Sequence, residues 1–149
     1  MYQHILVPTD GSTLANKAVA EGVKLASALS SRLTFLTVFV PFASLADHDH
    51  AFAGMPETVR RPALAYLEAE GREALAAASS VAKSAGVIAD TLWIESDHPY
   101  EAIIDTAKSK GADLILMASH GRSGVKAVLL GSVTQKVLSH TQLPVLVCR

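Results

Sequence analysis

The sequence predicts an α/β fold, a three-layer α/β/α sandwich around a five-stranded parallel sheet. Five short apolar runs alternate with longer segments of helical period, which is the pattern of successive βαβ units. Half of the 149 residues are hydrophobic and only 18% are charged, so the chain can bury a sizeable core and is expected to form one domain over residues 1–149. Because parallel crossovers are right-handed, the expected strand order is 3-2-1-4-5.

The apolar runs give the expected strands in chain order. They are His4–Val7, Leu33–Val40, Val87–Glu95, Asp113–Ala118 and Pro144–Cys148. The first helix is expected after Ser12 or Thr13, either of which is a suitable N-cap. Its core-facing stripe comprises Leu14, Ala18, Leu25, Ala26 and Leu29.

The connection between the second and third strands is longer than the others. Its first part, from Pro41 to about Arg61, is expected to be an exposed loop because it is interrupted by glycine and proline. A long helix follows from Pro62 until Gly86, which is well placed to end it in a left-handed turn. The residues of helical spacing in this segment are Leu64, Leu67, Leu75, Ala78 and Ala82.

Two further helices complete the alternation. One begins near Pro99, since proline suits a first helical turn, and ends at Gly111. The residues expected to face the sheet from it are Ile103, Ile104 and Ala107. The other begins near Ser132 and stops before Pro144, with Val133, Val137 and Leu138 as its apolar residues.

Charge and cysteine usage exclude several classes of protein. A formal charge of −1 provides no field that would attract nucleic acid or an anionic membrane. The single cysteine, Cys148, excludes an internal disulfide framework and suits a reducing compartment. The N-terminus lacks a signal-peptide pattern, and no run approaches the roughly 20 apolar residues that span a bilayer. We therefore expect a soluble cytoplasmic protein.

Two segments are expected to converge where the strand order reverses, between the first and fourth strands. The first is Pro8–Ser12 and the second runs from Met117 to Ser132. Small residues let backbone N–H groups approach a phosphate, and Gly131-Ser132 opens a helix whose first amides are unpaired. The second segment is therefore a candidate phosphate cradle. Candidate additional donors are the hydroxyls of Ser132 and Thr134 and the cations Arg122 and Lys126. The alternative is that the glycines are ordinary turn residues and Ser132 is an ordinary N-cap.

Asp10 follows the first strand, beside the candidate cradle. A carboxylate there would repel a phosphate unless it met a ribose hydroxyl or a metal ion, so a ribose contact is the favoured interpretation. The alternative is an Asx turn within Thr9-Asp10-Gly11.

These residues carry a family resemblance. The chain resembles the universal stress proteins over its whole length, from Ile5–Ser12 to Pro144–Val147. Nucleotide-binding members have Gly, two residues, Gly, nine residues, Gly and then Ser or Thr after the fourth strand. Here that stretch reads Ala118-Ser119-His120-Gly121, then residues 122–130, then Gly131-Ser132. The resemblance implies a Rossmann-like, adenine nucleotide alpha hydrolase-like sheet.

The resemblance also implies a ligand. This is ATP or a related adenine nucleotide such as AMP or a cyclic nucleotide, usually with Mg²⁺, bound with little or no hydrolysis in a stress-response role. Asp10 would hold the ribose, Gly121, Gly131 and Ser132 the phosphates, and backbone around Val38 and Met117 the adenine. The full expected site comprises Pro8, Thr9, Asp10, Val38, Met117, Ala118, His120, Gly121, Arg122, Gly131, Ser132, Val133 and Thr134.

One residue departs from the family pattern. Ala118 replaces the first motif glycine, and its methyl group could narrow the backbone approach or forbid a positive φ, so we expect weakened binding. His120 could donate to a phosphate or cap the loop. The chain lacks a Gly-x-Ser-x-Gly elbow, a Walker A motif and a dinucleotide fingerprint, which disfavours those enzyme classes.

Other functions stay open at the level of sequence. One is a nucleotide-free dimeric interaction module that uses the loop from Pro41 to Arg61, and another is a slow ATP hydrolase. Zinc binding by Asp47, His48, Asp49 and His50 is a weak hypothesis, and the remaining histidines, His4, His98 and His140, are expected at the surface or at helix ends.

The final strand predicts an oligomeric state. An apolar strand at the edge of a sheet is open to pairing unless something covers it. The same strand of a second subunit, related by a two-fold axis, is the simplest cover, and the resemblance implies the same arrangement. We therefore expect a homodimer through Val145–Val147.

Overall fold

The computed structural model describes residues 1–41, 54–122 and 130–149. Five strands form one sheet in the order β3-β2-β1-β4-β5, and every pairing is parallel. The strands are β1 (His4–Pro8), β2 (Arg32–Phe39), β3 (Ala89–Glu95), β4 (Leu114–Ala118) and β5 (Val145–Cys148). The helices are α1 (Thr13–Leu29), α3 (Glu57–Ser84), α4 (Pro99–Lys110) and α5 (Ser132–His140). The predicted fold class and strand order are confirmed.

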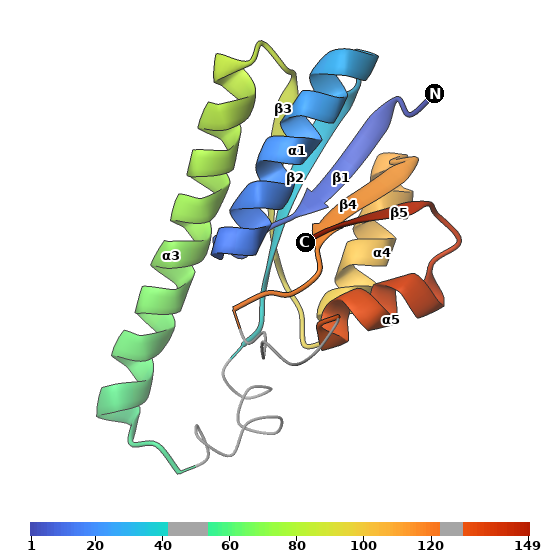
Figure 1. The fold of residues 1–149 in the computed structure, drawn as a ribbon. Coiled ribbons are helices and arrows are strands. Elements are labelled where there is room, and N and C mark those ends of the chain that lie inside the picture. Colours follow the sequence, from blue (N-terminus) through green and yellow to red (C-terminus); the bar gives the residue numbers. More distant parts are fainter. Residues whose placement is uncertain (42–53, 123–129) are drawn as a thin grey trace.

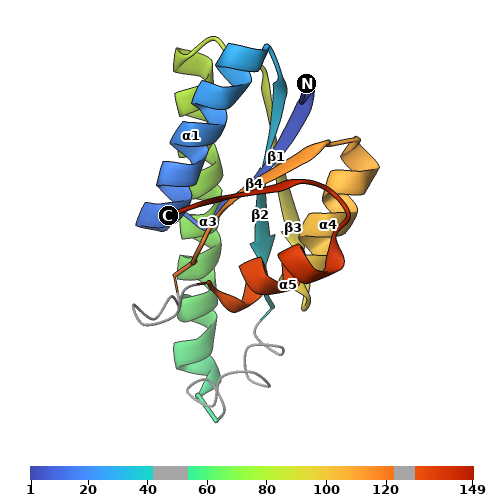
Figure 2. The ribbon, with the colours of Figure 1, turned by 45° about the vertical axis from the view of Figure 1, so that its right-hand side comes forward.

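The helices cover both faces of the sheet. Helices α1 and α3 lie on one face and α4 and α5 on the other (Figures 1 and 2). Successive strand residues enter different layers, so Ile5 and Val7 pack on the α1 and α3 side while Leu6 packs on the α4 and α5 side. Phe35, on the first of these sides, is the largest fully buried side chain. Burial of an apolar side chain of this kind contributes about 1.5–3 kcal/mol to folding.

Helix α1 begins as predicted, and its predicted stripe is confirmed in part, since Ala18 and Ala26 are buried. The Ser12 hydroxyl accepts a hydrogen bond from the Ala15 N–H at 3.2 Å, which confirms the N-cap. The fully buried residues are Ala15, Ala18, Val19, Gly22, Val23 and Ala26, and the three predicted leucines lie at the margins of this stripe. Small residues bring the helix close to the sheet, since a Cβ at Gly22 would lie 3.0 Å from Val7 Cγ2.

Helix α3 starts earlier than predicted. It begins at Glu57, so residues 57–61 are helical and their assignment to a loop was wrong. The N–H groups of Val59 and Arg60 both bond to the Pro56 carbonyl, and Glu57 pairs with Arg61 at 3.4 Å. Pro62 therefore sits in the second turn, where it removes one backbone hydrogen bond without ending the helix. Residues 42–53 of the predicted loop lie outside the described residues.

The other predicted helix boundaries are confirmed. Gly86 and Gly111 have φ values of +69° and +67° and follow α3 and α4 in left-handed conformation. Pro99 is the first residue of α4, and the three residues expected to face the sheet from it are buried. Of the apolar residues of α5, Val137 is buried, whereas Leu138 is 40% exposed.

The histidine expectations are confirmed in part. His98 is the N-cap of α4 and His140 is the last residue of α5. His4 is buried, and its Nε2 lies 2.8 Å from Thr34 Oγ1, so the prediction of a surface position for His4 was wrong. No helix in the described parts of the chain is both long enough and apolar enough to cross a bilayer.

Candidate functional site

A cavity of about 670 Å³ lies at the carboxyl ends of β1, β2, β3 and β4. Its volume is within the usual range for small-molecule sites, and it lies where the strand order reverses, as predicted. Every residue of the predicted site lines it, namely Pro8, Thr9, Asp10, Val38, Met117, Ala118, His120, Gly121, Arg122, Gly131, Ser132, Val133 and Thr134. The sheet topology thus brings together segments that lie more than a hundred residues apart in the chain.

The Asp10 carboxylate connects the two loops of the site. Its Oδ1 accepts from the Ser12 N–H at 2.9 Å, which is the Asx turn considered as an alternative. Its Oδ2 accepts from the Arg122 N–H, also at 2.9 Å. A carboxylate has about four lone-pair positions, so each oxygen can still accept a hydrogen bond from a ligand hydroxyl. The Asx turn and a ribose contact are therefore compatible.

Two glycines permit this close approach. A Cβ at Gly121 would lie 2.6 Å from Asp10 Oδ2, a separation that real side chains do not adopt. Gly11 has a φ of +77°, and a Cβ there would lie 3.0 Å from the Ala74 side chain of α3. The first glycine makes room for the carboxylate, and the second both turns the chain and lets α3 pack against the loop.

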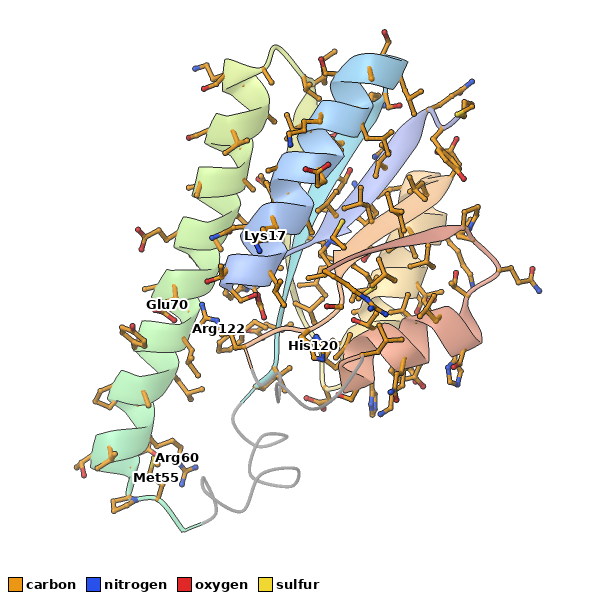
Figure 3. All side chains as sticks on the ribbon, viewed as in Figure 1. Lys17, Met55, Arg60, Glu70, His120 and Arg122 are labelled. Carbon is orange, nitrogen blue, oxygen red and sulfur yellow. The ribbon has the colours of Figure 1, made fainter. Side chains whose placement is uncertain are left out.

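Arg122 directs its side chain toward α3. Its Nε donates to the Asp10 carbonyl at 2.9 Å, and its Nη1 forms an ion pair with the Glu70 carboxylate. Glu70 Oε1 also accepts from the Tyr66 hydroxyl at 2.6 Å. The hydrogen bonds from Tyr66 and then Arg122 lower the pKa of Glu70 below its ordinary value. Figure 3 shows Glu70 and Arg122 pointing toward each other, with His120 on the α5 side.

The N-terminus of α5 forms the opposite wall. Gly131, not Ser132, is the N-cap, and among the described residues no side chain makes a capping hydrogen bond at this N-terminus. The Gly131 N–H donates to the Ser119 carbonyl at 2.7 Å, which holds the helix start against the end of β4. The first amides of α5, at Ser132 and Val133, therefore belong to a helix end with a partial positive charge.

Two predicted donors have other partners. The Thr134 hydroxyl is buried and donates to the Ala118 carbonyl at 2.9 Å, so its proton is not available to a ligand. His120 Nδ1 lies 3.0 Å from the Ser119 hydroxyl, a contact that orients the ring within the loop.

Ala118 is tolerated by the backbone of the strand. Among the described residues other than glycine, only Ser30 has a positive φ, so Ala118 does not occupy a conformation that requires glycine. It pairs with Cys148 as an ordinary residue of β4. The expected conformational penalty at this position is absent.

The apolar part of the cavity spans both faces of the sheet. Val38 and Met117 belong to the α4 and α5 side. On the α3 side Phe39 and Trp93 stack with their ring centroids 5.3 Å apart, and a Cβ at Gly71 would lie 2.7 Å from Trp93 Cζ3. The sequence analysis did not identify the contributions of Phe39, Leu67, Gly71 and Trp93 to this wall. Alternation along β2 could have indicated Phe39, but the α3 residues depend on how that helix packs.

The remaining hypotheses from the sequence concern metal binding, Lys126 and Cys148. Asp47, His48, Asp49, His50 and Lys126 lie outside the described residues. Within residues 1–41, 54–122 and 130–149, no group of three or more His, Cys, Asp or Glu side chains is arranged to hold a metal ion. Burial, together with the charge of Glu21, raises the pKa of the Cys148 thiol, which disfavours a reactive thiolate.

Comparison with known proteins identifies the family. The model of the universal stress protein family matches residues 1–149. The universal stress protein YxiE of Bacillus subtilis is 32% identical over 149 residues, which cover all of both chains. This chain belongs to the universal stress protein family. The resemblance noted from the residues around Asp10 and Gly131 is confirmed.

Solved universal stress proteins share the fold of this family member. UspA from Lactobacillus plantarum has a TM-score of 0.74 and 29% identity, with 99% of this chain and 98% of that chain covered. A universal stress protein solved in complex with cAMP has a TM-score of 0.66 and 26% identity, with 98% of this chain and 95% of that chain covered. At least one related protein of this fold therefore binds an adenine nucleotide.

Proposed function

We propose that this universal stress protein binds ATP at the carboxyl edge of its sheet and acts in the stress response through its nucleotide-bound state, with little or no hydrolysis. The observation that carries the proposal is the arrangement of one cavity. It has the Asp10 carboxylate on one wall and, on another, the α5 N-terminus, which no described side chain caps. A helix N-terminus favours anions and a carboxylate favours hydroxyl donors, so the cavity matches a ligand that carries both groups.

The proposed placement follows the chemistry of the walls. The adenine lies near Val38 and Met117, where the cavity is apolar. The ribose hydroxyls donate to Asp10, and the phosphates accept from amides near Gly121 and Gly131. The relative in complex with cAMP supports an adenine nucleotide but leaves the number of phosphates to experiment.

Mg²⁺ fits this proposal as a companion of the nucleotide. Mg²⁺ is commonly bound through one or two carboxylates together with substrate phosphates and water. Asp10 is the carboxylate on the cavity wall, and because it accepts from the ribose hydroxyls in this proposal, the ion would be held mainly by the phosphates and water; the described residues contain no dedicated cluster of ligands. The ion would shield phosphate charge, while the chain itself supplies the amides.

Calorimetric titration with ATP and Mg²⁺ tests the proposal. We expect saturable binding by the wild-type chain, which Asp10→Ala weakens about tenfold or more because a charged hydrogen-bond partner is lost. Asp105→Ala is the matched control, since Asp105 is exposed on α4 away from the cavity. AMP and cAMP are titrated in parallel to rank the ligands. No binding of any of the three at millimolar concentration would favour a nucleotide-free interaction module.

We also propose that two chains associate through β5 and that the protein works in the cytoplasm as one domain over residues 1–149. The edge position of β5 supports the dimer, and its Leu146 is 45% exposed. Sedimentation analysis should give twice the chain mass of 15.7 kDa, and Leu146→Lys should shift the protein toward the monomer. A wild-type chain that sediments as a monomer at all concentrations would contradict the dimer.

A further inference from the structure

One side-chain network reaches the proposed nucleotide site from outside its loops. On α3, Tyr66, Glu70 and Ala74 recur every four residues and therefore lie on one face of the helix. Ala74 lies against Gly11, and Glu70 pairs with Arg122. This face of α3 thus contacts both loops that meet at Asp10.

The contacts form a continuous chain from α3 to the Asp10 carboxylate. The Tyr66 hydroxyl holds Glu70 Oε1 at 2.6 Å, and Glu70 Oε2 holds the guanidinium of Arg122. Arg122 bonds Asp10 twice, through Nε to its carbonyl and through the backbone N–H to Oδ2, both at 2.9 Å. Within the part of the chain that the structure describes, the hydrogen-bond partners of the Arg122 guanidinium are oxygens of Glu70 on α3 and of Asp10 in the β1 loop.

This geometry disfavours a direct phosphate contact by Arg122. Its side chain extends toward Glu70 on α3, and Figure 3 shows the two side chains pointing toward each other, away from the start of α5. The guanidinium is also neutralised by Glu70, so its attraction for a phosphate is reduced. The arrangement instead holds the loop in place, so that the Arg122 N–H stays within hydrogen-bond distance of the Asp10 carboxylate.

We propose that Glu70 and Tyr66 are positioning residues of the nucleotide site, acting through Arg122 to fix the Asp10 carboxylate for the ribose hydroxyls. The inference rests on the proposed nucleotide binding. In this inference Arg122 supports the carboxylate that binds the ribose and does not itself bind a phosphate. Loss of Glu70 should therefore weaken only ligands whose sugar hydroxyls meet Asp10.

The experiment compares two ligands by calorimetry, ATP and 2′,3′-dideoxy-ATP, each with Mg²⁺. Glu70→Gln should weaken ATP binding about three- to tenfold, the change expected for one impaired hydrogen bond, and leave the affinity for the dideoxy ligand unchanged. Tyr66→Phe should act in the same direction with a smaller effect. Arg122→Lys keeps the charge but lacks the Nε donor, and it should resemble Glu70→Gln.

A matched control separates the effect of the Glu70 contacts from the effect of removing one negative charge from α3. Glu73→Gln removes the same charge from an exposed site on α3, three residues from Glu70, and should bind both ligands as the wild type does. Equal weakening of both ligands by Glu70→Gln, or wild-type affinity for ATP in Arg122→Lys, would overturn the inference in favour of a phosphate contact. Unchanged ATP binding by Glu70→Gln would overturn it alone, whereas a wild-type chain that binds no nucleotide would overturn the proposed function and this inference together.

Discussion

Replacing Gly121 with alanine tests whether the two loops of the site are held together by Asp10. A Cβ at Gly121 would lie 2.6 Å from Asp10 Oδ2, so the carboxylate must move by several tenths of an ångström. That movement breaks the 2.9 Å hydrogen bond from the Arg122 N–H. Loss of a hydrogen bond to a charged group costs about 1.5–3 kcal/mol, and because Asp10 is partly exposed we expect about 1.5 kcal/mol.

The control is the same substitution in an Asp10→Ala background. There the new methyl group meets no carboxylate, and Gly121 does not have a positive φ, so Gly121→Ala should be neutral or slightly stabilising. Urea unfolding followed by the fluorescence of Trp93, the single tryptophan, measures all four proteins. A coupling of about 1.5 kcal/mol is expected, and equal costs in both backgrounds within about 0.5 kcal/mol would refute the reasoning.

Two further predictions concern packing and pH. Gly71→Ala would place a Cβ 2.7 Å from Trp93 Cζ3. The cost of overpacking should exceed the gain in helix propensity by about 1 kcal/mol, so the Tm should fall by about 2–4 °C. An unchanged or higher Tm would contradict this prediction. Burial raises the pKa of Asp113, but the N–H groups of Gln3 and His4 bond to its carboxylate and hold the pKa below the ordinary value. The ionised carboxylate therefore stabilises the fold above about pH 4, and this contribution is lost as the pH falls through the lower folded-state pKa. Asp113→Asn should lower the free energy of unfolding at pH 7 and lose most of that difference near pH 2, and a difference that is constant with pH would refute this.

The strand order and the place of the site could be predicted from the sequence because both follow from local pattern and handedness. Apolar runs separated by helical segments leave few topologies, and in these the ends of β1 and β4 are neighbours. The start of α3 could not be predicted in the same way. Pro62 suggested a helix start, but the Pro56 carbonyl and the ion pair of Glu57 begin the helix five residues earlier.

The contribution of α3 to the site could not be predicted from the hydrophobic pattern of the sequence either. The rotation of a helix about its axis and its shift along the sheet depend on packing, here on contacts such as Gly71 with Trp93 and Ala74 with Gly11. The partner of Arg122 follows from that packing, so Glu70 could not be identified beforehand.

A ¹H–¹⁵N correlation spectrum recorded during titration with ATP and Mg²⁺ tests the central claim most directly. If the nucleotide binds between the two loops, the largest changes in chemical shift should occur at the amides of Asp10, Gly121 and Gly131, with little change at Ser109, which lines a shallow cleft beside α4. Absence of change at millimolar ATP, or changes concentrated around Ser109, would contradict the account.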